Sequence, residues 1–183
     1  MDIDKVIKER YSCRKFSSKK PNWRDIIECV DAVRYAPMAG GICSVRVIIV
    51  DDKEKIQKLA EASQQDFVGS VDYVVVFCSN SAKTKCFEER CDRYCRQQAG
   101  AAIQNFLLKI QEKGMSTCWV GHFVDEQIKA ALKIPDNIEV EAICPVGYEL
   151  KKQKRKSKME IDAMLYFNKY KNKKMDKPKQ VKA

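Results

Sequence analysis

Residues 10–16, R-Y-S-C-R-K-F, carry the side chains of this chain that are best suited to binding an anion. Arg10 and Arg14 stand four residues apart, with Ser12 between them. A planar guanidinium grips a phosphate through two parallel hydrogen bonds, and a hydroxyl can donate a third. A solvated basic turn is the alternative, because charge clusters near helix ends are common. Taken alone, the stretch favours the basic turn over an anion site.

Other catalytic side chains are few. His122 is the single histidine, so a Ser-His-Asp or Cys-His arrangement would depend wholly on it, and a lone histidine near a strand end is more often structural. Neither G-x-x-x-x-G-K-[ST] nor G-x-G-x-x-G occurs. A bound cofactor is therefore the natural source of any chemistry.

The nine cysteines do not indicate a disulfide framework. Their number is odd, they are scattered, and the charged N-terminus is unlike an export signal, which favours reduced thiols in a cytoplasm. Cys86, Cys91 and Cys95 are the only cluster, without a fourth metal ligand or C-x-x-C spacing. We interpret them as buried or half-buried thiols, with redox-active thiols beside a redox cofactor as the alternative.

The net charge of +10 belongs to one end of the chain. Residues 151–183 hold 13 basic and 3 acidic side chains, whereas residues 1–150 hold 22 of each. A neutral body with a basic tail is weak evidence for a nucleic-acid-binding domain, which usually spreads its cations over a folded face. We therefore do not expect nucleic acid as a partner. No window approaches the roughly 18 apolar residues of a membrane span, so we expect no membrane partner either.

The apolar patterns predict helices mixed with strands. Helices are expected at residues 2–10, from Pro21–Asn22 to before Pro37, and at 54–62, 88–113 and 125–132. Strands are expected at 45–50 and 71–78, both buried, and at 116–121 and 138–148. The mixture lacks a regular βαβ repeat, which favours an α+β fold. We expect one domain over residues 1–170 and a basic, disordered tail over 171–183.

Several further motifs follow residues 10–16 in order. They are A-P-M-A-G-G-I, a buried strand, Q-Q-D-F-V, Q-A-G-A-A-I-Q-N-F-L-L-K, G-M-S-T-C-W-V-G-H-F, I-P-D-N-I-E-V-E-A-I-C-P-V-G-Y and K-R-K-S-K-M-E. This series closely resembles the nitroreductase family of FMN-dependent oxidoreductases, over roughly residues 3–168.

The resemblance implies a mainly antiparallel central sheet flanked by helices, and an intertwined homodimer with FMN at the subunit interface. It also implies that the flavin carries the chemistry, so no catalytic side chain and no metal is expected. NADH or NADPH would reduce the flavin at N5, and nitro compounds, quinones or a related acceptor would then reoxidise it in the same cavity, by ping-pong kinetics. The buried helix segment Ala99 to Leu108 would suit a subunit interface, because its small residues let another helix approach.

The family's FMN-binding positions map onto five parts of this chain. Arg10, Tyr11, Ser12 and Arg14 match the segment that binds the phosphate and ribityl chain, and Cys13 between them is expected to point away from the phosphate. The loop of Pro37, Met38, Ala39, Gly40 and Gly41 matches the one that lies against the flavin. Gln65 matches a polar residue near the edge of the isoalloxazine ring. Gly121 is the last residue of the family's W-x-G motif, here W-V-G, which lies near the same ring. Lys154, Arg155 and Lys156 fall where a late basic residue reaches the phosphate, with Arg155 the first choice.

The chain also departs from the family pattern. Where the family often has A-P-S-x-x-N-x-Q-P-W, this chain has A-P-M-A-G-G-I-C-S-V, and the frequent Asp before the buried helix is Gln98. Met38, Gly41 and Cys43 therefore change the floor of the cavity. Two other functions stay open: a flavin-binding protein without turnover, and a nucleic-acid-associated protein that uses its Lys-rich tail.

Overall fold

The computed structural model describes residues 2–152 and 157–175, without the side chains of residues 83–86. The chain divides into two units, Met1–Lys152 and Gln153–Ala183. Of the described residues, those in the first unit form all the strands, and those in the second form the short helix α7 (Ile161–Met164). Among the described residues, no helix is long and apolar enough to cross a membrane.

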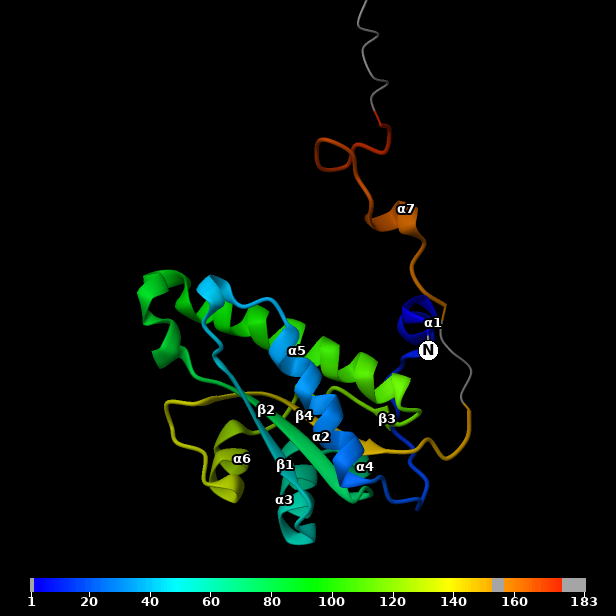
Figure 1. Cartoon of the computed structure of the whole chain (residues 1–183), viewed down its shortest axis with the longest axis vertical. Coiled ribbons are helices and arrows are strands. Elements are labelled where there is room, and N and C mark those ends of the chain that lie inside the picture. The colour runs from blue at the N-terminus through cyan, green and yellow to red at the C-terminus, as the bar shows by residue number, and fades with distance from the viewer. Residues whose placement is uncertain (1, 153–156, 176–183) are drawn as a thin grey trace, which may run out of the picture. The chain divides into compact units, whose positions relative to one another are not determined.

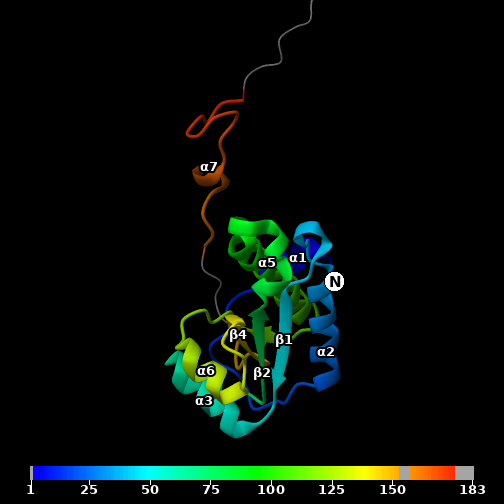
Figure 2. The ribbon, with the colours of Figure 1, turned by 90° about the vertical axis from the view of Figure 1, so that its left-hand side faces the viewer.

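A four-stranded antiparallel sheet forms the centre of the first unit (Figures 1 and 2). Its strands are β1 (Val45–Val50), β2 (Tyr73–Ser79), β3 (Ser116–Thr117) and β4 (Glu139–Gly147), in the spatial order β1-β2-β4-β3. This arrangement, with helices on both faces, confirms the predicted α+β fold with a mainly antiparallel sheet.

Each face of the sheet has its own helical layer. One core joins the sheet to α2 (Trp23–Asp31), the 3₁₀ turn η1 (Ala32–Tyr35) and α5 (Cys91–Glu112), with Phe77 and Phe106 packed edge to face at 5.2 Å. The other joins it to α3 (Lys53–Ser63), α4 (Asp66–Gly69) and α6 (Asp125–Leu132). The remaining elements are α1 (Ile3–Glu9), η2 (Ala39–Gly41) and η3 (Ser81–Arg90).

Side-chain caps explain where several predicted helices begin. Asp2 accepts from the backbone N–H of Asp4, Asn22 from that of Arg24 and Asp52 from that of Lys55. These bonds satisfy donors that the first helical turn leaves free. Helix α5 ends at Glu112, and Gly114, two residues beyond it, has a φ of +71°, a conformation that suits glycine.

Four expectations were wrong in detail. β1 is an edge strand, with Arg46 exposed and Val47 to Ile49 only half-buried, because it has a neighbour on one side only. The long helix begins at Cys91 instead of Glu88, because the positive φ of Glu88 keeps that residue out of the helix. β3 is shorter than 116–121, with one further bridge at Val120. In α2 and η1, where an apolar stripe of Trp23, Ile26, Ile27, Val30 and Val33 is expected from the spacing to face the core, Trp23 and Ile27 are 47% exposed.

Candidate functional site

The segment Arg10–Arg14 is held in an extended form against the edge of the sheet. Arg10 ends α1, and Ser12 then forms a parallel bridge with Thr117 of β3. The backbone N–H of Cys13 donates to the Thr117 carbonyl at 2.9 Å. Cys13 is fully buried, so the residues on either side of it carry the accessible polar groups.

The Cys118 thiol shows where the polar side chains of this segment gather. Burial raises the pKa of Cys118, while the Arg14 guanidinium, a hydrogen bond with Ser12 and the Arg10 guanidinium act to lower it. The bridge from Ser12 to Thr117 likewise places this segment beside Cys118, the residue that follows Thr117. Among the described residues neither Arg10 nor Arg14 forms an ion pair. Two unpaired guanidiniums beside a hydroxyl are donors suited to a phosphate.

Tyr11 points to another part of the chain. Its hydroxyl donates to Oε2 of Glu149 at 2.5 Å, across 138 residues of sequence. Burial, followed by this hydrogen bond, raises the pKa of Tyr11 above its ordinary value, so the phenol stays protonated. A close contact reinforces the link, because a Cβ at Gly147 would lie 2.8 Å from the Phe16 ring. The start of the chain is thus fixed to the end of β4.

The loop Pro37–Gly41 contains η2 and two residues in left-handed conformation, Gly40 (φ +56°) and Gly41 (φ +70°). Gln98 of α5, which is buried, holds this loop. With its amide nitrogen toward the Ile42 carbonyl (3.0 Å), its oxygen meets the backbone N–H of Ala39 (3.3 Å), and the amide also contacts the Ser44 hydroxyl. This orientation satisfies both ends of the amide, which the opposite one does not.

The chain segments that contain Gln65 and Gly121 are joined by a backbone hydrogen bond. Gln65 precedes α4 and is half-buried. Gly121 is exposed and follows Val120, which bridges Ile143 of β4. The backbone N–H of Val124 donates to the Ala62 carbonyl at 2.9 Å, which joins the chain just after Gly121 to the chain just before Gln65.

The predicted cofactor residues therefore fall into two groups. Arg10–Arg14, Gly121 and Gln65 are linked through residues 117–124. The loop Pro37–Gly41 lies near the other end of β4. The Ser44 carbonyl, just after this loop, accepts from the backbone N–H of Asn80, whose neighbour Ser79 pairs with Glu139 at the start of β4. Thr117, beside the segment Arg10–Arg14, instead pairs with Val146 near the end of β4. Glu139 and Val146 are about 23 Å apart at about 3.3 Å per residue. One copy does not bring the two groups together, and Lys154, Arg155 and Lys156 lie outside the described residues.

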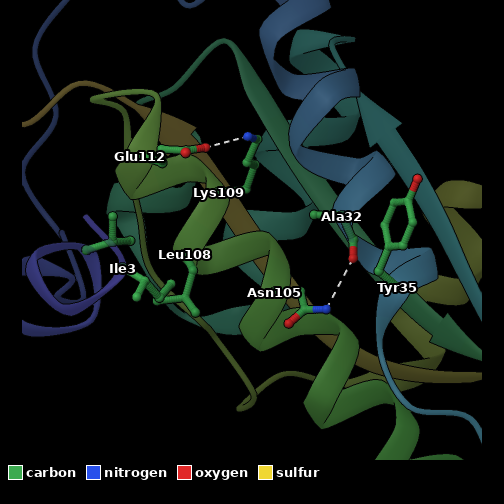
Figure 3. A pocket seen from close by; sticks show the side chains of 8 residues that line it. Ile3, Ala32, Tyr35, Asn105, Leu108, Lys109 and Glu112 are labelled. Atoms are coloured by element: carbon green, nitrogen blue, oxygen red, sulfur yellow. Dashed lines mark hydrogen bonds and ion pairs between the residues drawn. The ribbon is translucent and has the colours of Figure 1, made fainter. Parts of the chain in front are cut away.

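A groove of about 370 Å³ opens between α1, η1 and α5 (Figure 3). Apolar side chains, among them Ile3, Tyr35 and Leu108, line it together with Asn105, whose Nδ2 donates to the Ala32 carbonyl at 3.2 Å. Lys109 and Glu112 pair at its rim. Most apolar residues of the segment Ala99 to Leu108 pack into the core of their own chain, so only part of this helix faces the groove.

The cysteines form no metal site among the described residues. The eight cysteines whose side chains are described are free thiols. Burial raises the pKa of Cys29 to about 12 and that of Cys78 to about 11, so both remain protonated. Cys91 donates to the Ser81 carbonyl and Cys95 is buried, while the side chain of Cys86 lies outside the described residues. His122 is exposed.

Sequence reasoning did not identify Glu149, Phe16 or Cys118 as parts of this site. Each acts through a partner distant in sequence, and no local pattern marks such a contact. Gln98 was noticed only as a departure from the family pattern.

Comparison with known proteins agrees with the fold and the motif order. The sequence profile described as Nitroreductase family matches residues 7–70 and 63–148. An Archaeoglobus fulgidus protein, named as an NADH dehydrogenase/NAD(P)H nitroreductase, is 28% identical over 79% of this chain and 83% of its own length. An iodotyrosine deiodinase of Thermotoga neapolitana is 24% identical over 78% of this chain and 86% of its own length.

Among solved structures, an FMN-dependent nitroreductase of Clostridium difficile R20291 superposes with a TM-score of 0.78. It is 23% identical, and the match covers 90% of this chain and 98% of that one.

Proposed function

Because the chain belongs to the nitroreductase family, we propose that it is an FMN-dependent oxidoreductase that reduces nitro compounds, quinones or a related acceptor with NADH or NADPH. The observation that carries the proposal is the extended segment Arg10–Arg14, which is bridged to Thr117 and whose two arginines form no ion pair among the described residues. The names of the Archaeoglobus relative and of the Clostridium structure support the nicotinamide donor and the cofactor respectively. The deiodinase relative shows that acceptors vary among similar chains.

The donors near Cys118 fit the phosphate of FMN. The phosphate carries nearly two negative charges, and a partly buried dianion needs more than one cation. Arg10 and Arg14 would supply two, Ser12 a hydroxyl, and Lys154, Arg155 or Lys156 a further charge. FMN, when bound, accepts hydride at N5. The protein's own residues would hold and orient the flavin ring. Tyr11 fixes the segment Arg10–Arg14 through its hydrogen bond to Glu149. Gln65 would offer a polar side chain at the edge of the ring, and Gly121, without a side chain, would leave room for it.

The same proposal includes a homodimer. One copy separates the loop Pro37–Gly41 from Arg10–Arg14, so a second copy would have to bring its own loop to the flavin. The groove between α1 and α5 supports this, because Ile3 and Tyr35, which line it, are more than half exposed. Apolar patches of this kind commonly mark interfaces. Sedimentation equilibrium should give twice the mass of 21.1 kDa.

The proposed location is the cytoplasm. It is supported by the free thiols among the described side chains, which suit a reducing compartment.

A spectrum of the purified protein tests the function. It should show flavin absorbance, and anaerobic NADH or NADPH, added separately, should bleach it. A colourless protein that does not bind added FMN would contradict the proposal. A yellow protein that neither nicotinamide bleaches would instead be a flavin-binding protein without turnover, a candidate that the loop A-G-G favours because it lacks polar side chains.

A further inference from the structure

A ribbon of two antiparallel segments continues outward from Arg14. Phe16 bridges Glu149, the backbone N–H of Leu150 donates to the Lys15 carbonyl at 2.9 Å, and that of Ser17 donates to the Tyr148 carbonyl at 2.8 Å. We call residues 10–20 and 148–152 the basic ribbon. In Figure 1 the dark blue chain after α1 passes beside the end of β4 at this place.

The basic ribbon concentrates positive charge on a body that is otherwise acidic. It holds seven basic side chains and one acidic one, Glu149. The remainder of residues 1–147 holds 17 basic and 21 acidic side chains. A local excess of this kind steers an oppositely charged partner toward one face.

No acidic side chain among the described residues neutralises the cations of the basic ribbon through an ion pair, whereas Lys53, Lys113 and Lys129 do form such pairs. Lys19 instead lies 4.3 Å above the Tyr148 ring and Lys20 lies 5.3 Å from the Tyr73 ring. All five lysines of the ribbon are exposed, and they are Lys15, Lys19, Lys20, Lys151 and Lys152.

The shape of the basic ribbon favours an acidic protein over a nucleic acid. Leu150 is 56% exposed among the lysines, so an apolar contact is surrounded by charges. This arrangement suits the small, weak encounters of electron-transfer proteins, in which charge sets orientation and association rate. A single-stranded nucleic acid would need open aromatic faces for stacking. Phe16 packs on Gly147, and Lys19 covers Tyr148.

We infer that the basic ribbon docks an acidic electron-carrier protein, which serves as an electron donor to the flavin. This rests on the proposed function, because the ribbon begins at the predicted phosphate segment. Two reduced one-electron carriers would each give one electron, and a proton from solvent completes the equivalent of the hydride that a nicotinamide brings. The carriers are oxidised and the cofactor is reduced by two electrons.

Calorimetric titration of the full-length holoprotein with an acidic ferredoxin tests the inference. The complex should form at low salt and weaken at least tenfold at physiological salt, since screening acts on exposed charges. The double variant K19E/K20E should raise the dissociation constant about tenfold or more. The control K58E/K133E makes the same charge change on exposed lysines of α3 and of the chain after α6, and should change it little. Bleaching by nicotinamide should be unaffected in both variants.

Absence of binding at low salt, or equal weakening by both double variants, would overturn the inference. So would ribbon-dependent binding of a single-stranded RNA or of phosphatidylserine vesicles by a holoprotein that does not bind the ferredoxin. A yellow protein that is bleached by nicotinamide but ignores the ferredoxin contradicts this inference alone. A colourless protein contradicts the proposed function first.

Discussion

The side-chain amide of Gln98 lies 3.1 Å from the hydroxyl of Ser44, and the two residues join helix α5 to the chain just after the loop Pro37–Gly41. The same amide reaches the backbone of Ala39 and Ile42. A loop of alanine and glycine has no side chain with which to fix itself, so one buried amide sets its position.

Replacement of Gln98 by Leu should therefore lower the free energy of unfolding by about 1–3 kcal/mol, because it leaves buried polar groups without partners. FMN affinity should fall with it if the loop contacts the flavin. Urea denaturation and FMN titration measure the two effects. Gln97→Leu, at the exposed neighbouring position, is the control and should change neither by much.

Removal of a phosphate donor should weaken FMN binding without unfolding the protein. Arg14→Ala should raise the FMN dissociation constant at least tenfold, because a hydrogen bond to a charged group contributes about 1.5–3 kcal/mol. Ser12→Ala should have a smaller effect in the same direction. Fluorescence titration gives the constants and circular dichroism checks the fold. Arg24→Ala, which removes an exposed arginine of α2, should bind FMN as the parent does, and unchanged affinity in the Arg14 and Ser12 variants would return this segment to a basic turn.

Alanine at Gly40 and at Gly41 should separate steric from conformational cost. Both glycines have positive φ, so alanine at either costs about 1 kcal/mol. At Gly40 the new Cβ would also lie 2.9 Å from the Phe87 ring, whereas at Gly41 nothing lies within 4 Å. Gly40→Ala should therefore lower the melting temperature more than Gly41→Ala. An equal loss would mean that Phe87 moves aside without cost.

Alkaline pH should expose the link between Tyr11 and Glu149. The folded state raises the pKa of Tyr11, so the stability it contributes is complete below the unfolded pKa of about 10 and falls as pH rises above it. Tyr11→Phe should be less stable at neutral pH, by about 1 kcal/mol for the lost hydrogen bond. It should also lose stability less steeply than the parent above pH 10 or so. Thermal melts across that range measure both, and Tyr170→Phe, at a 78% exposed position, should match the parent.

The sequence predicts where helices and strands lie better than it predicts which elements pack against one another. The helical pattern that predicts α3 is local, and so are the β-branched residues that predict β1 and β2. Nothing local says that β1 stands at an edge, since a strand's apolar run records its own preference and not what packs on it. The phosphate segment was predicted through the order of motifs, and its cofactor role remains a prediction.

Contacts over long sequence distances account for what could not be predicted. Gln98 meets Ser44 across 54 residues, and Tyr11 meets Glu149 across 138. A buried glutamine and a tyrosine near a helix end look like many others in sequence. Only the packing of α5 and the path of β4 bring their partners within reach.

The bridge from Ser12 to Thr117 and the bond from Tyr11 to Glu149 also fix an order of events during translation. Residues 10–14 leave the ribosome more than 100 residues before their partners Thr117 and Glu149. At about 5–20 residues per second, synthesis of those partners follows that of residues 10–14 by on the order of ten seconds. If this segment binds the FMN phosphate, as proposed, the site stays incomplete throughout most of synthesis, and we expect FMN to bind only after Thr117 and Glu149 have left the ribosome.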